Sequence, residues 1–404
     1  MPYNSRISGR TRAPRTAYHS GGNSGRSRSP QRKGPKKDYI HPSRFVKAAA
    51  PVAEENYEPK NRFSDFAMHP TLHANIERKG FERPSPIQDE AIPLGLAGRD
   101  IIGIANTGTG KTVAFAVPVL HRLMTDPGSK VLVIAPTREL AQQIEDEFRA
   151  IGKGTGLRGT LLIGGTSMSN QLRDLRVNPE IIIGTPGRIM DHIRRGSLSL
   201  DDVNTVVLDE VDRMLDMGFV EDVSDILGKL ATERQSFFFS ATMDRKVENL
   251  ISFFSNDPVT VSVKTGDTTE NVHQDIICYD TSTAKIEQLH NVLLAQGMSK
   301  AIVFDDTQRA VERLSDELIA RGFKADAIHG GKSQGQRKRA LERFKRNEIN
   351  VLVATDVAAR GIDVADISHV INYSQPQDFE TYSHRIGRAG RAGKIGYALT
   401  FITE

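Results

Sequence analysis

The chain has 404 residues, of which 38% are hydrophobic, and this length is enough for two ordinary domains and a tail. It contains no apolar run near the ~18 residues that a membrane span requires, which argues against a membrane partner. The single cysteine, Cys278, excludes an internal disulfide and any cysteine-based zinc site, and its strand-like surroundings predict a packed thiol. These features predict a protein of a reducing compartment, the cytoplasm.

The positive charge is concentrated at the N-terminus. Residues 1–47 hold twelve Lys or Arg side chains and one acid, so they carry +11, and the rest of the chain carries −7 of the total +4. Residues 1–60 are rich in Ser, Gly, Arg and Pro, and this composition buries too little apolar surface to offset chain entropy. We expect a disordered basic tail, which either binds phosphate backbones without sequence preference or only solubilises the chain.

From Asn61 onward, short apolar runs alternate with helical segments. Buried runs of this kind predict parallel sheets that are covered by helices on both faces. A break at residues 256–258 predicts two tandem α/β domains, over 61–258 and 273–404, joined by a linker over 259–272. The expected strands are 101–104, 131–135, 160–163, 181–183, 205–208 and 237–239, followed by 276–279, 301–304, 325–328, 351–354, 369–372 and 398–402.

Residues 105–112 read Ala-Asn-Thr-Gly-Thr-Gly-Lys-Thr and lie between an expected strand and an expected helix. A glycine-rich loop in this position directs backbone N–H groups toward one point, and the helix N-terminus adds partial positive charge. Lys111 supplies a full charge for the outer phosphates, and Thr112 supplies a hydroxyl for Mg²⁺. The segment predicts a phosphate-binding loop built from Ala105, Thr107, Gly108, Thr109, Gly110, Lys111 and Thr112.

Two acids follow the expected strand 205–208. Alone, such acids most often begin a solvated helix, but a phosphate loop in the same parallel sheet favours catalysis. Asp209 is placed to hold Mg²⁺, and Glu210 to position and activate the attacking water.

Upstream, Gln88 carries an amide able to pair with adenine, and Phe63 could stack on the base. Standing alone, these two residues would be a helix-start residue and a core aromatic.

Together these segments resemble the motifs of a DEAD-box RNA helicase, a superfamily-two ATPase with two RecA-like domains. The resemblance covers about residues 61–404, and the motifs occur in the family's order and spacing. The family is named after an Asp-Glu-Ala-Asp tetrad, and residues 209–212 form a bacterial-type Asp-Glu-Val-Asp variant of it. In that family the phosphate loop normally begins with Ala, as at Ala105. Residues 80–88 are similar to the adenine-reading Q motif, which includes Arg83 and Gln88.

The resemblance also implies roles in the second domain. Residues 384–391 are similar to the motif that carries the arginine fingers, which makes Arg388 and Arg391 the side chains that reach the γ-phosphate. Gly361 and Asp363 match the position that contacts the ribose. Further residues match the motifs that couple nucleotide state to domain closure, although Ser240 could be only a helix cap. The coupling residues are Asp212, Ser240, Thr242 and His384.

RNA contacts in the family run along one edge of both domains. Threonine hydroxyls, glycine N–H groups and arginine side chains suit phosphate and 2′-OH groups rather than bases, so we expect sequence-independent binding of single strands and short duplexes. The matching residues are Pro136, Thr137, Arg138, Gly165, Thr185, Gly187, Arg188, Gly330, Gln334, Arg337, Thr355, Asp356 and Arg360.

Three positions depart from the family. Val211 replaces the usual Ala, which removes no catalytic oxygen, and Ala389 replaces the usual Thr, which removes a hydroxyl but no charge. The chain stops at Glu404, where members usually continue into a closing helix, and we expect this to affect the stability of the second domain. The activity is therefore expected to persist.

The sequence as a whole predicts a monomeric, ATP- and Mg²⁺-dependent RNA helicase that separates short duplexes locally or remodels RNA–protein complexes. Ribosomal or mRNA-decay proteins are candidate partners. An ATP-gated RNA clamp, an RNA chaperone acting through the tail, and a DNA helicase are the alternatives that remain open.

Overall fold

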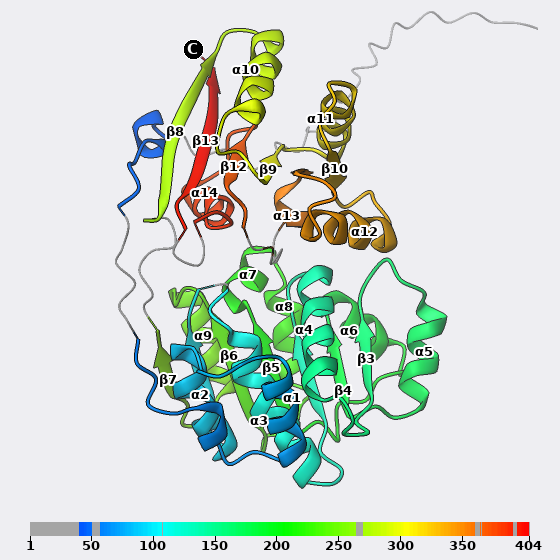
Figure 1. The fold of residues 1–404 in the computed structure, drawn as a ribbon. Helices are drawn as coiled ribbons and strands as arrows, with labels where there is room; N and C mark the ends of the chain where they lie inside the picture. The colour runs from blue at the N-terminus through cyan, green and yellow to red at the C-terminus, as the bar shows by residue number, and fades with distance from the viewer. Residues whose placement is uncertain are drawn as a thin grey trace, which may run out of the picture. The chain divides into compact units, whose positions relative to one another are not determined.

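The computed structural model describes residues 40–50, 57–106, 108–263, 270–359, 364, 366–390 and 394–403. Within them the chain forms two parallel sheets with helices packed on both faces of each (Figure 1). The predicted α/β fold with two tandem domains is confirmed. Among the described helices, none combines the length and apolar character that a membrane crossing needs.

The first domain is built on a seven-stranded sheet in the order β3-β4-β2-β5-β6-β1-β7. Its central strands are continuous apolar runs because both of their faces are covered. In β2, Val131 and Val133 pack on one face, whereas Leu132 and Ile134 pack on the other. The strands are β1 (Ile101–Ile104), β2 (Val131–Ile134), β3 (Gly159–Leu162), β4 (Ile181–Gly184), β5 (Thr205–Asp209), β6 (Gln235–Ser240) and β7 (Val259–Ser262).

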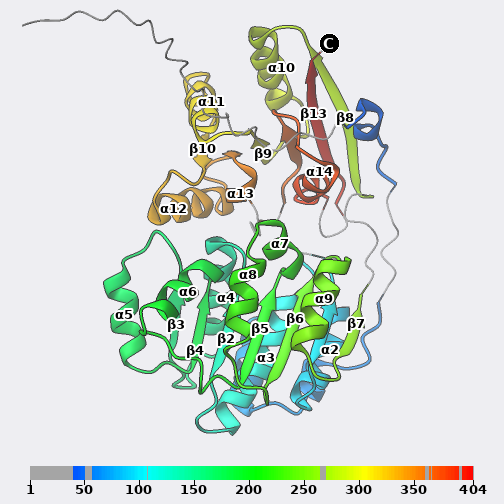
Figure 2. The same ribbon diagram turned by 180° about the vertical axis from the view of Figure 1, so that it is seen from behind.

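Helices divide between the two faces of this sheet, as Figure 2 shows from behind. One face is covered by η2 (Phe63–Asp65), α1 (Pro70–Arg78), α2 (Pro86–Leu96), α3 (Lys111–Thr125) and α4 (Arg138–Ile151). The other is covered by α6 (Pro186–Arg194), α7 (Val211–Asp216), α8 (Val220–Leu227) and α9 (Arg245–Phe254), while α5 (Met168–Arg176) lies beside β3.

The second domain has a six-stranded parallel sheet in the order β10-β11-β9-β12-β13-β8. Its strands are β8 (Val272–Tyr279), β9 (Ala301–Phe304), β10 (Ala325–Ile328), β11 (Val351–Ala354), β12 (His369–Asn372) and β13 (Gly396–Thr403). Its helices are α10 (Ser282–Leu294), α11 (Gln308–Ala320), α12 (Gln334–Lys345), α13 (Asp356–Ala359) and α14 (Phe379–Ile386). Helices α10 and α11 pack on one face, and α12, α13 and α14 on the other.

Residues 40–50 pack against the second domain, which differs from the disorder expected up to residue 60. Phe45, the last residue of η1 (Pro42–Phe45), is 1% exposed, and its ring centroid lies 4.8 Å from that of Tyr382 on α14. Lys47 forms an antiparallel bridge with Gln274 on the edge strand β8. A composition averaged over sixty residues hides this short apolar segment. The rest of the expected tail, residues 1–39 and 51–56, lies outside the described residues.

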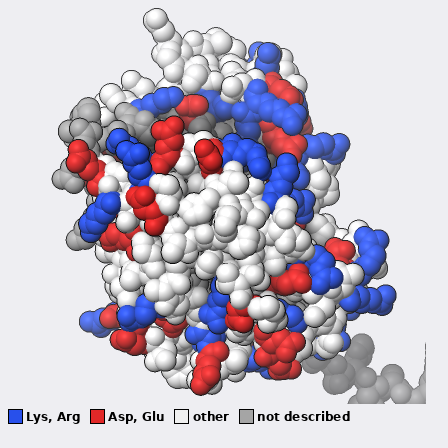
Figure 3. Space-filling model, turned by 60° about the horizontal axis from the view of Figure 1, so that its bottom comes forward, with Lys and Arg blue, Asp and Glu red and all other residues white. Residues whose placement is uncertain are grey.

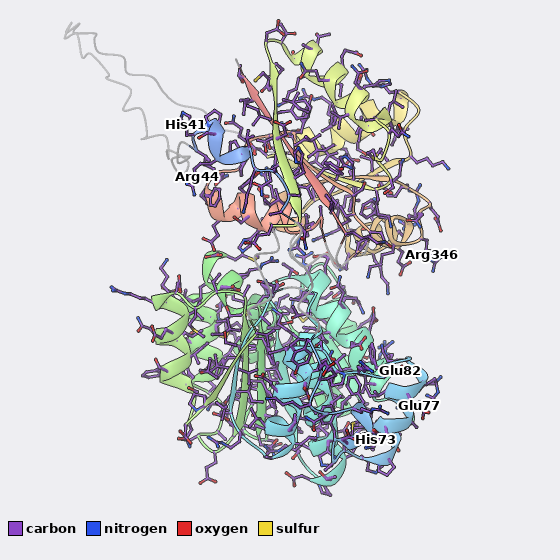
Figure 4. All side chains as sticks on the ribbon, turned by 60° about the vertical axis from the view of Figure 1, so that its left-hand side comes forward. His41, Arg44, His73, Glu77, Glu82 and Arg346 are labelled. Atoms are coloured by element: carbon purple, nitrogen blue, oxygen red, sulfur yellow. The ribbon has the colours of Figure 1, made fainter. Side chains whose placement is uncertain are left out.

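The same segment also covers α14 from outside. The guanidinium of Arg44 lies 3.7 Å from the centre of the Phe379 ring, a distance typical of a cation–π contact. Figure 4 shows Arg44 on η1, with His41 just before this helix, beside β8 and α14. The N-terminal segment is therefore part of the second domain's structure.

Two further expectations differ from the structure. Residues 259–262, assigned to the linker, form β7 and pair with β1, because the Pro258 turn precedes one more short edge strand. Cys278 is exposed rather than packed, because β8 lies at the edge of its sheet and alternate side chains of a strand face opposite sides.

Candidate active site

The carboxyl ends of the first domain's strands gather the predicted site residues. The phosphate loop follows β1, Asp209 ends β5, and Ser240 ends β6, and these three strands are neighbours in the sheet. The strands are parallel, so these ends meet at one edge, which is where ligands bind in open α/β sheets. The fold thus brings together residues that are more than a hundred positions apart in the sequence.

Glycine is required at position 110 of the phosphate loop. Its φ of +90° lies in the left-handed region, and a Cβ there would lie 2.3 Å from the Nε2 atom of Gln88. The loop is also anchored at its start, where the N–H of Ala105 donates to the carbonyl of Ser240 at 3.0 Å. Thr107 lies outside the described residues. The loop is therefore held by neighbouring segments rather than by its own sequence alone.

The Q-motif segment packs directly on this loop. Gln88 donates from Nε2 to the carbonyl of Gly110 at 3.0 Å and accepts from the N–H of Ser85 at 2.9 Å. The Ser85 hydroxyl donates to the carbonyl of Thr109 at 2.7 Å. Two of the polar groups expected to read adenine thus already bind protein, and Gln88 keeps one N–H and one lone pair for a base.

Phe63 is a core side chain in this structure. It is 4% exposed, and its ring centroid lies 5.7 Å from that of Phe66 and 6.0 Å from that of Phe81. Stacking on a base would require one face of the ring to become exposed. Arg83, which was assigned to the same adenine site, is exposed.

Lys111 and Asp209 face each other in a buried position. The Nζ atom lies 3.7 Å from Oδ1 of Asp209, and it has no hydrogen-bond partner among the described residues. Burial, together with the neighbouring Glu210, raises the pKa of Asp209 to about 6, against the opposing effect of Lys111. A buried ammonium that makes no hydrogen bond is costly, so this position suits an anionic ligand.

Glu210 is held in an unusual backbone conformation. Its φ of +56° lies in the left-handed region, which is uncommon for a residue with a side chain. Its Oε2 atom accepts from Nη1 of Arg213 at 3.1 Å, whereas Oε1 is buried and has no hydrogen-bond partner in the described part of the chain. Backbone strain of this kind is typical of functional sites.

These unpartnered atoms fit ATP and Mg²⁺. The Nζ atom of Lys111 would meet the outer phosphates. Oxygen ligands for Mg²⁺ are available at the Thr112 hydroxyl and the Asp209 carboxylate.

Asp212 ties the end of β6 to the start of α7. Its Oδ2 atom accepts hydrogen bonds from the N–H groups of Ala241 and Thr242, at 3.0 and 2.9 Å, and from the Thr242 hydroxyl at 3.1 Å. The Ser240 hydroxyl accepts from the N–H of Asp212 at 3.3 Å. The segment expected to couple nucleotide state to closure is thus bonded to the acidic tetrad.

The other half of the same edge carries the expected RNA residues of the first domain. Pro136 and Thr137 follow β2, Gly165 follows β3, and Thr185 precedes α6 after β4. The sheet order β3-β4-β2-β5-β6-β1 therefore places these residues on one side of Asp209 and the nucleotide residues on the other. Thr137 also caps α4, since its hydroxyl accepts from the N–H of Leu140 at 3.2 Å.

Arginines along this half are held by their neighbours. The guanidinium of Arg138 lies close to Gly165, where a Cβ would come within 2.4 Å of Nη1. Arg188 donates to Oε1 of Gln171 at 3.1 Å, and Gln171 in turn donates to the carbonyl of Ile163 at 2.9 Å. Gly187, in the first turn of α6, has open space where a Cβ would be. Sequence reading missed Gln171, which no motif marks.

In the second domain, Asp356 is engaged by an arginine that sequence reading did not single out. Arg385 is 2% exposed and binds both oxygens of Asp356, at 2.6 and 2.7 Å. It also donates to the carbonyl of Ser374 at 2.8 Å and to Asn372 at 3.2 Å. This bidentate pair fixes the end of α14, which Arg388 follows after two residues.

The remaining predicted residues have varied surroundings. Arg337 is buried and forms an ion pair with Glu139 at 2.7 Å. Burial raises the pKa of Glu139, although Arg337 acts in the opposite direction.

The other predicted residues of the second domain differ in exposure. Arg388 and Thr355 are buried, Gln334 and His384 are half-buried, and Gly330 is exposed. Arg360, Gly361, Asp363 and Arg391 lie outside the described residues.

Comparisons with known proteins identify the family. A DEAD/DEAH box helicase model matches residues 85–250, and a helicase conserved C-terminal domain model matches residues 284–393. The DEAD-box ATP-dependent RNA helicase CshA of Bacillus licheniformis is 46% identical over 342 residues, which cover 84% of this chain and 70% of that protein. The chain belongs to the DEAD-box family of ATP-dependent RNA helicases. CshA of Bacillus subtilis is 45% identical over the same share of the chain and 69% of its own length.

Solved DEAD-box structures match the fold as well. Saccharomyces cerevisiae Dbp5 bound to RNA and ADP BeF3 has a TM-score of 0.75 at 30% identity, covering 85% of this chain and 89% of that one. Mss116p bound to ssRNA and AMP-PNP has a TM-score of 0.76 at 29% identity, covering 86% and 76%. The names of the CshA relatives, ATP-dependent RNA helicases, favour a helicase over an ATP-gated clamp.

The face drawn in Figure 3 has mixed charge. Lys and Arg side chains are interspersed there with Asp and Glu around a central area of uncharged residues. This agrees with the mildly acidic balance of residues 48–404. Such a face does not offer a polyanion a continuous basic track.

Proposed function

We propose that this DEAD-box helicase uses RNA-stimulated ATP hydrolysis to separate short duplexes locally, without sequence preference. One observation supports this most. Two buried polar atoms without hydrogen-bond partners in the described chain, Nζ of Lys111 and Oε1 of Glu210, flank Asp209 at one sheet edge. A phosphate anion and an attacking water are the groups that these two atoms need.

On this proposal the nucleotide is held from several sides. Lys111 and the loop residues from Ala105 to Thr112 bind the phosphates, and Gln88 uses its remaining N–H and lone pair for adenine. The Thr112 hydroxyl and the Asp209 carboxylate would hold Mg²⁺. When bound, Mg²⁺ neutralises charge on the phosphates and orients them for attack. Arg83 and Phe63 line the base, the latter after exposing one ring face, and Gly361 and Asp363 contact the ribose.

Glu210 orients the attacking water and accepts its proton through Oε1. Arg388 and Arg391 neutralise the charge that develops on the γ-phosphate, which makes hydrolysis depend on the second domain. Asp212, which is bonded to Ser240 and Thr242, couples the nucleotide state of the site to domain closure. His384 takes part in the same coupling.

RNA is bound along the other half of the edge. Thr137, Thr185 and the backbone near Gly165 suit phosphate and 2′-OH groups, and none of the side chains there forms a base-reading set. The similarity to Dbp5 and Mss116p, whose structures contain bound RNA, supports RNA binding by this chain but does not test these residues. Ribosomal or mRNA-decay partners, a monomeric state and a cytoplasmic location complete the proposal.

Measurement of ATPase activity with and without RNA tests it. We expect RNA to stimulate hydrolysis, single-stranded DNA not to do so, and Glu210→Gln to abolish the stimulated rate. Glu221→Gln, an exposed residue on α8, is the matched control and should behave like the wild type. Equal stimulation by DNA, or none by RNA, would count against the proposal. Slow product release without duplex separation would favour an RNA clamp instead.

A further inference from the structure

Arg213 is a buried arginine next to the acidic tetrad that the roles proposed above do not use. It lies on α7, and Glu210 is the N-cap residue that immediately precedes this helix. Its side chain is 5% exposed, and that of Glu210 is 4% exposed. A guanidinium is always charged, so burying it requires a close partner.

The contact between these two side chains is one-sided. Nη1 of Arg213 donates to Oε2 of Glu210 at 3.1 Å, while Oε1 of the same carboxylate has no partner among the described residues. The backbone of Arg213 is fixed as well, because its N–H donates to Oδ1 of Asp212 at 2.9 Å. Both ends of the arginine are therefore anchored within the tetrad.

We propose that Arg213 is a positioning residue for Glu210. By holding Oε2, it prevents the carboxylate from turning about its last bond, so that Oε1 alone presents its lone pairs to the attacking water. This inference rests on the proposed role of Glu210 in hydrolysis. Pre-orientation of a reacting group is effective because small misplacements cost large factors in rate.

A purely structural ion pair would behave differently. Its loss would lower the stability of the first domain but leave the turnover of folded molecules unchanged. A positioning role lowers kcat in molecules that are folded and still bind ATP and RNA with unchanged affinity.

The test compares Arg213→Met with the wild type in steady-state ATP hydrolysis with saturating RNA. We expect kcat to fall by about 10- to 100-fold, with KM for ATP and the RNA affinity changed by less than about threefold. Arg234→Met is the matched control, because Arg234 is another partly buried arginine of this domain, bonded to the carbonyls of Ala231 and Phe254. It should keep the wild-type kcat.

One further variant makes the result decisive. Arg213→Lys keeps the charge but loses the planar fork, so its kcat should lie between those of the wild type and Arg213→Met.

A wild-type kcat in folded Arg213→Met would overturn the inference. If Arg213→Met does not fold, Arg213→Lys carries the test: reduced kcat at unchanged KM supports it, and wild-type kcat overturns it. Failure of the proposed function is distinguishable, because the wild type itself would then show no RNA-stimulated hydrolysis.

Discussion

Gln88 donates a hydrogen bond from its side-chain amide to the carbonyl of Gly110 at 3.0 Å. The residue expected to read adenine therefore also fixes the phosphate loop, and the two halves of the nucleotide site share one contact. Because Gly110 has no Cβ, this approach is open.

Gly110→Ala should raise KM for ATP at least tenfold. The new Cβ would lie 2.3 Å from Nε2 of Gln88, at a φ of +90°, so both the loop and the amide must shift. Steady-state ATPase kinetics measure the effect. Gly98→Ala is the matched control, since Gly98 has a φ of +79° but open space around its Cβ position. That variant should lose about 1 kcal/mol of stability and keep its KM; an equal KM for both variants would contradict the prediction.

Phe45→Ala should destabilise the second domain by about 3–5 kcal/mol, because it empties a fully buried aromatic site beside Tyr382. Urea unfolding followed by circular dichroism measures the change. Phe253→Ala, at a side chain that is 80% exposed, should be nearly neutral. If the two variants unfold alike, the packing of residues 40–50 on this domain is not present in solution.

Asp89→Asn should destabilise the first domain by about 2–4 kcal/mol at pH 7. The carboxylate accepts from the Tyr57 hydroxyl at 2.6 Å, from the N–H of Lys60 at 2.7 Å, and from Asn61 at 2.7 and 3.1 Å. An amide can accept only on its oxygen, so at least one donor loses its partner.

The effect of Asp89 should depend on pH. Burial alone would raise the pKa of Asp89, but hydrogen bonds from Tyr57, Asn61 and Lys60 outweigh it and lower the pKa from its usual value of 3.8. The charged form is therefore favoured in the folded state, and its contribution is complete above the unfolded-state value and lost as pH falls below it. The stability difference between wild type and Asp89→Asn should shrink below pH 3.8, and a constant difference would contradict this.

Val211→Ala restores the family's usual tetrad residue and should cost about 1–3 kcal/mol of stability with an unchanged kcat. Val211 is fully buried in the apolar cluster between the sheet and helices α6 to α9, so its methyl groups fill space there. Thermal unfolding and ATPase assays on the same preparation measure both effects. An increase in stability would show that valine is overpacked at this position.

Much of the fold was predictable, because buried parallel strands are continuous apolar runs that differ from their surroundings. The strands 301–304, 325–328, 351–354 and 369–372 were placed to the residue. Strand β7 was missed because it is a short edge strand after a proline, and residues 40–50 were missed because one buried phenylalanine is hidden in a polar, basic composition.

The site was predictable wherever a motif combines unusual residues at fixed spacing, as at Gly108, Gly110 and Lys111. It was not predictable where a residue acts through a neighbour distant in sequence. Arg385 binds Asp356 across twenty-nine positions, and no local pattern marks either as a partner of the other.

By itself the sequence determined the chemistry of this protein, because lysine, threonine and paired acids next to buried strands are sufficient to specify a phosphate loop and its carboxylates. Only the tertiary structure decided which of their atoms remain available. Gln88 uses one amide N–H for a hydrogen bond to Gly110, and one carboxylate oxygen of Glu210 accepts a hydrogen bond from Arg213. The ammonium of Lys111 makes no hydrogen bond to the described residues. The physical reason is that availability depends on what packs beside an atom, and packing is set by the fold rather than by local sequence.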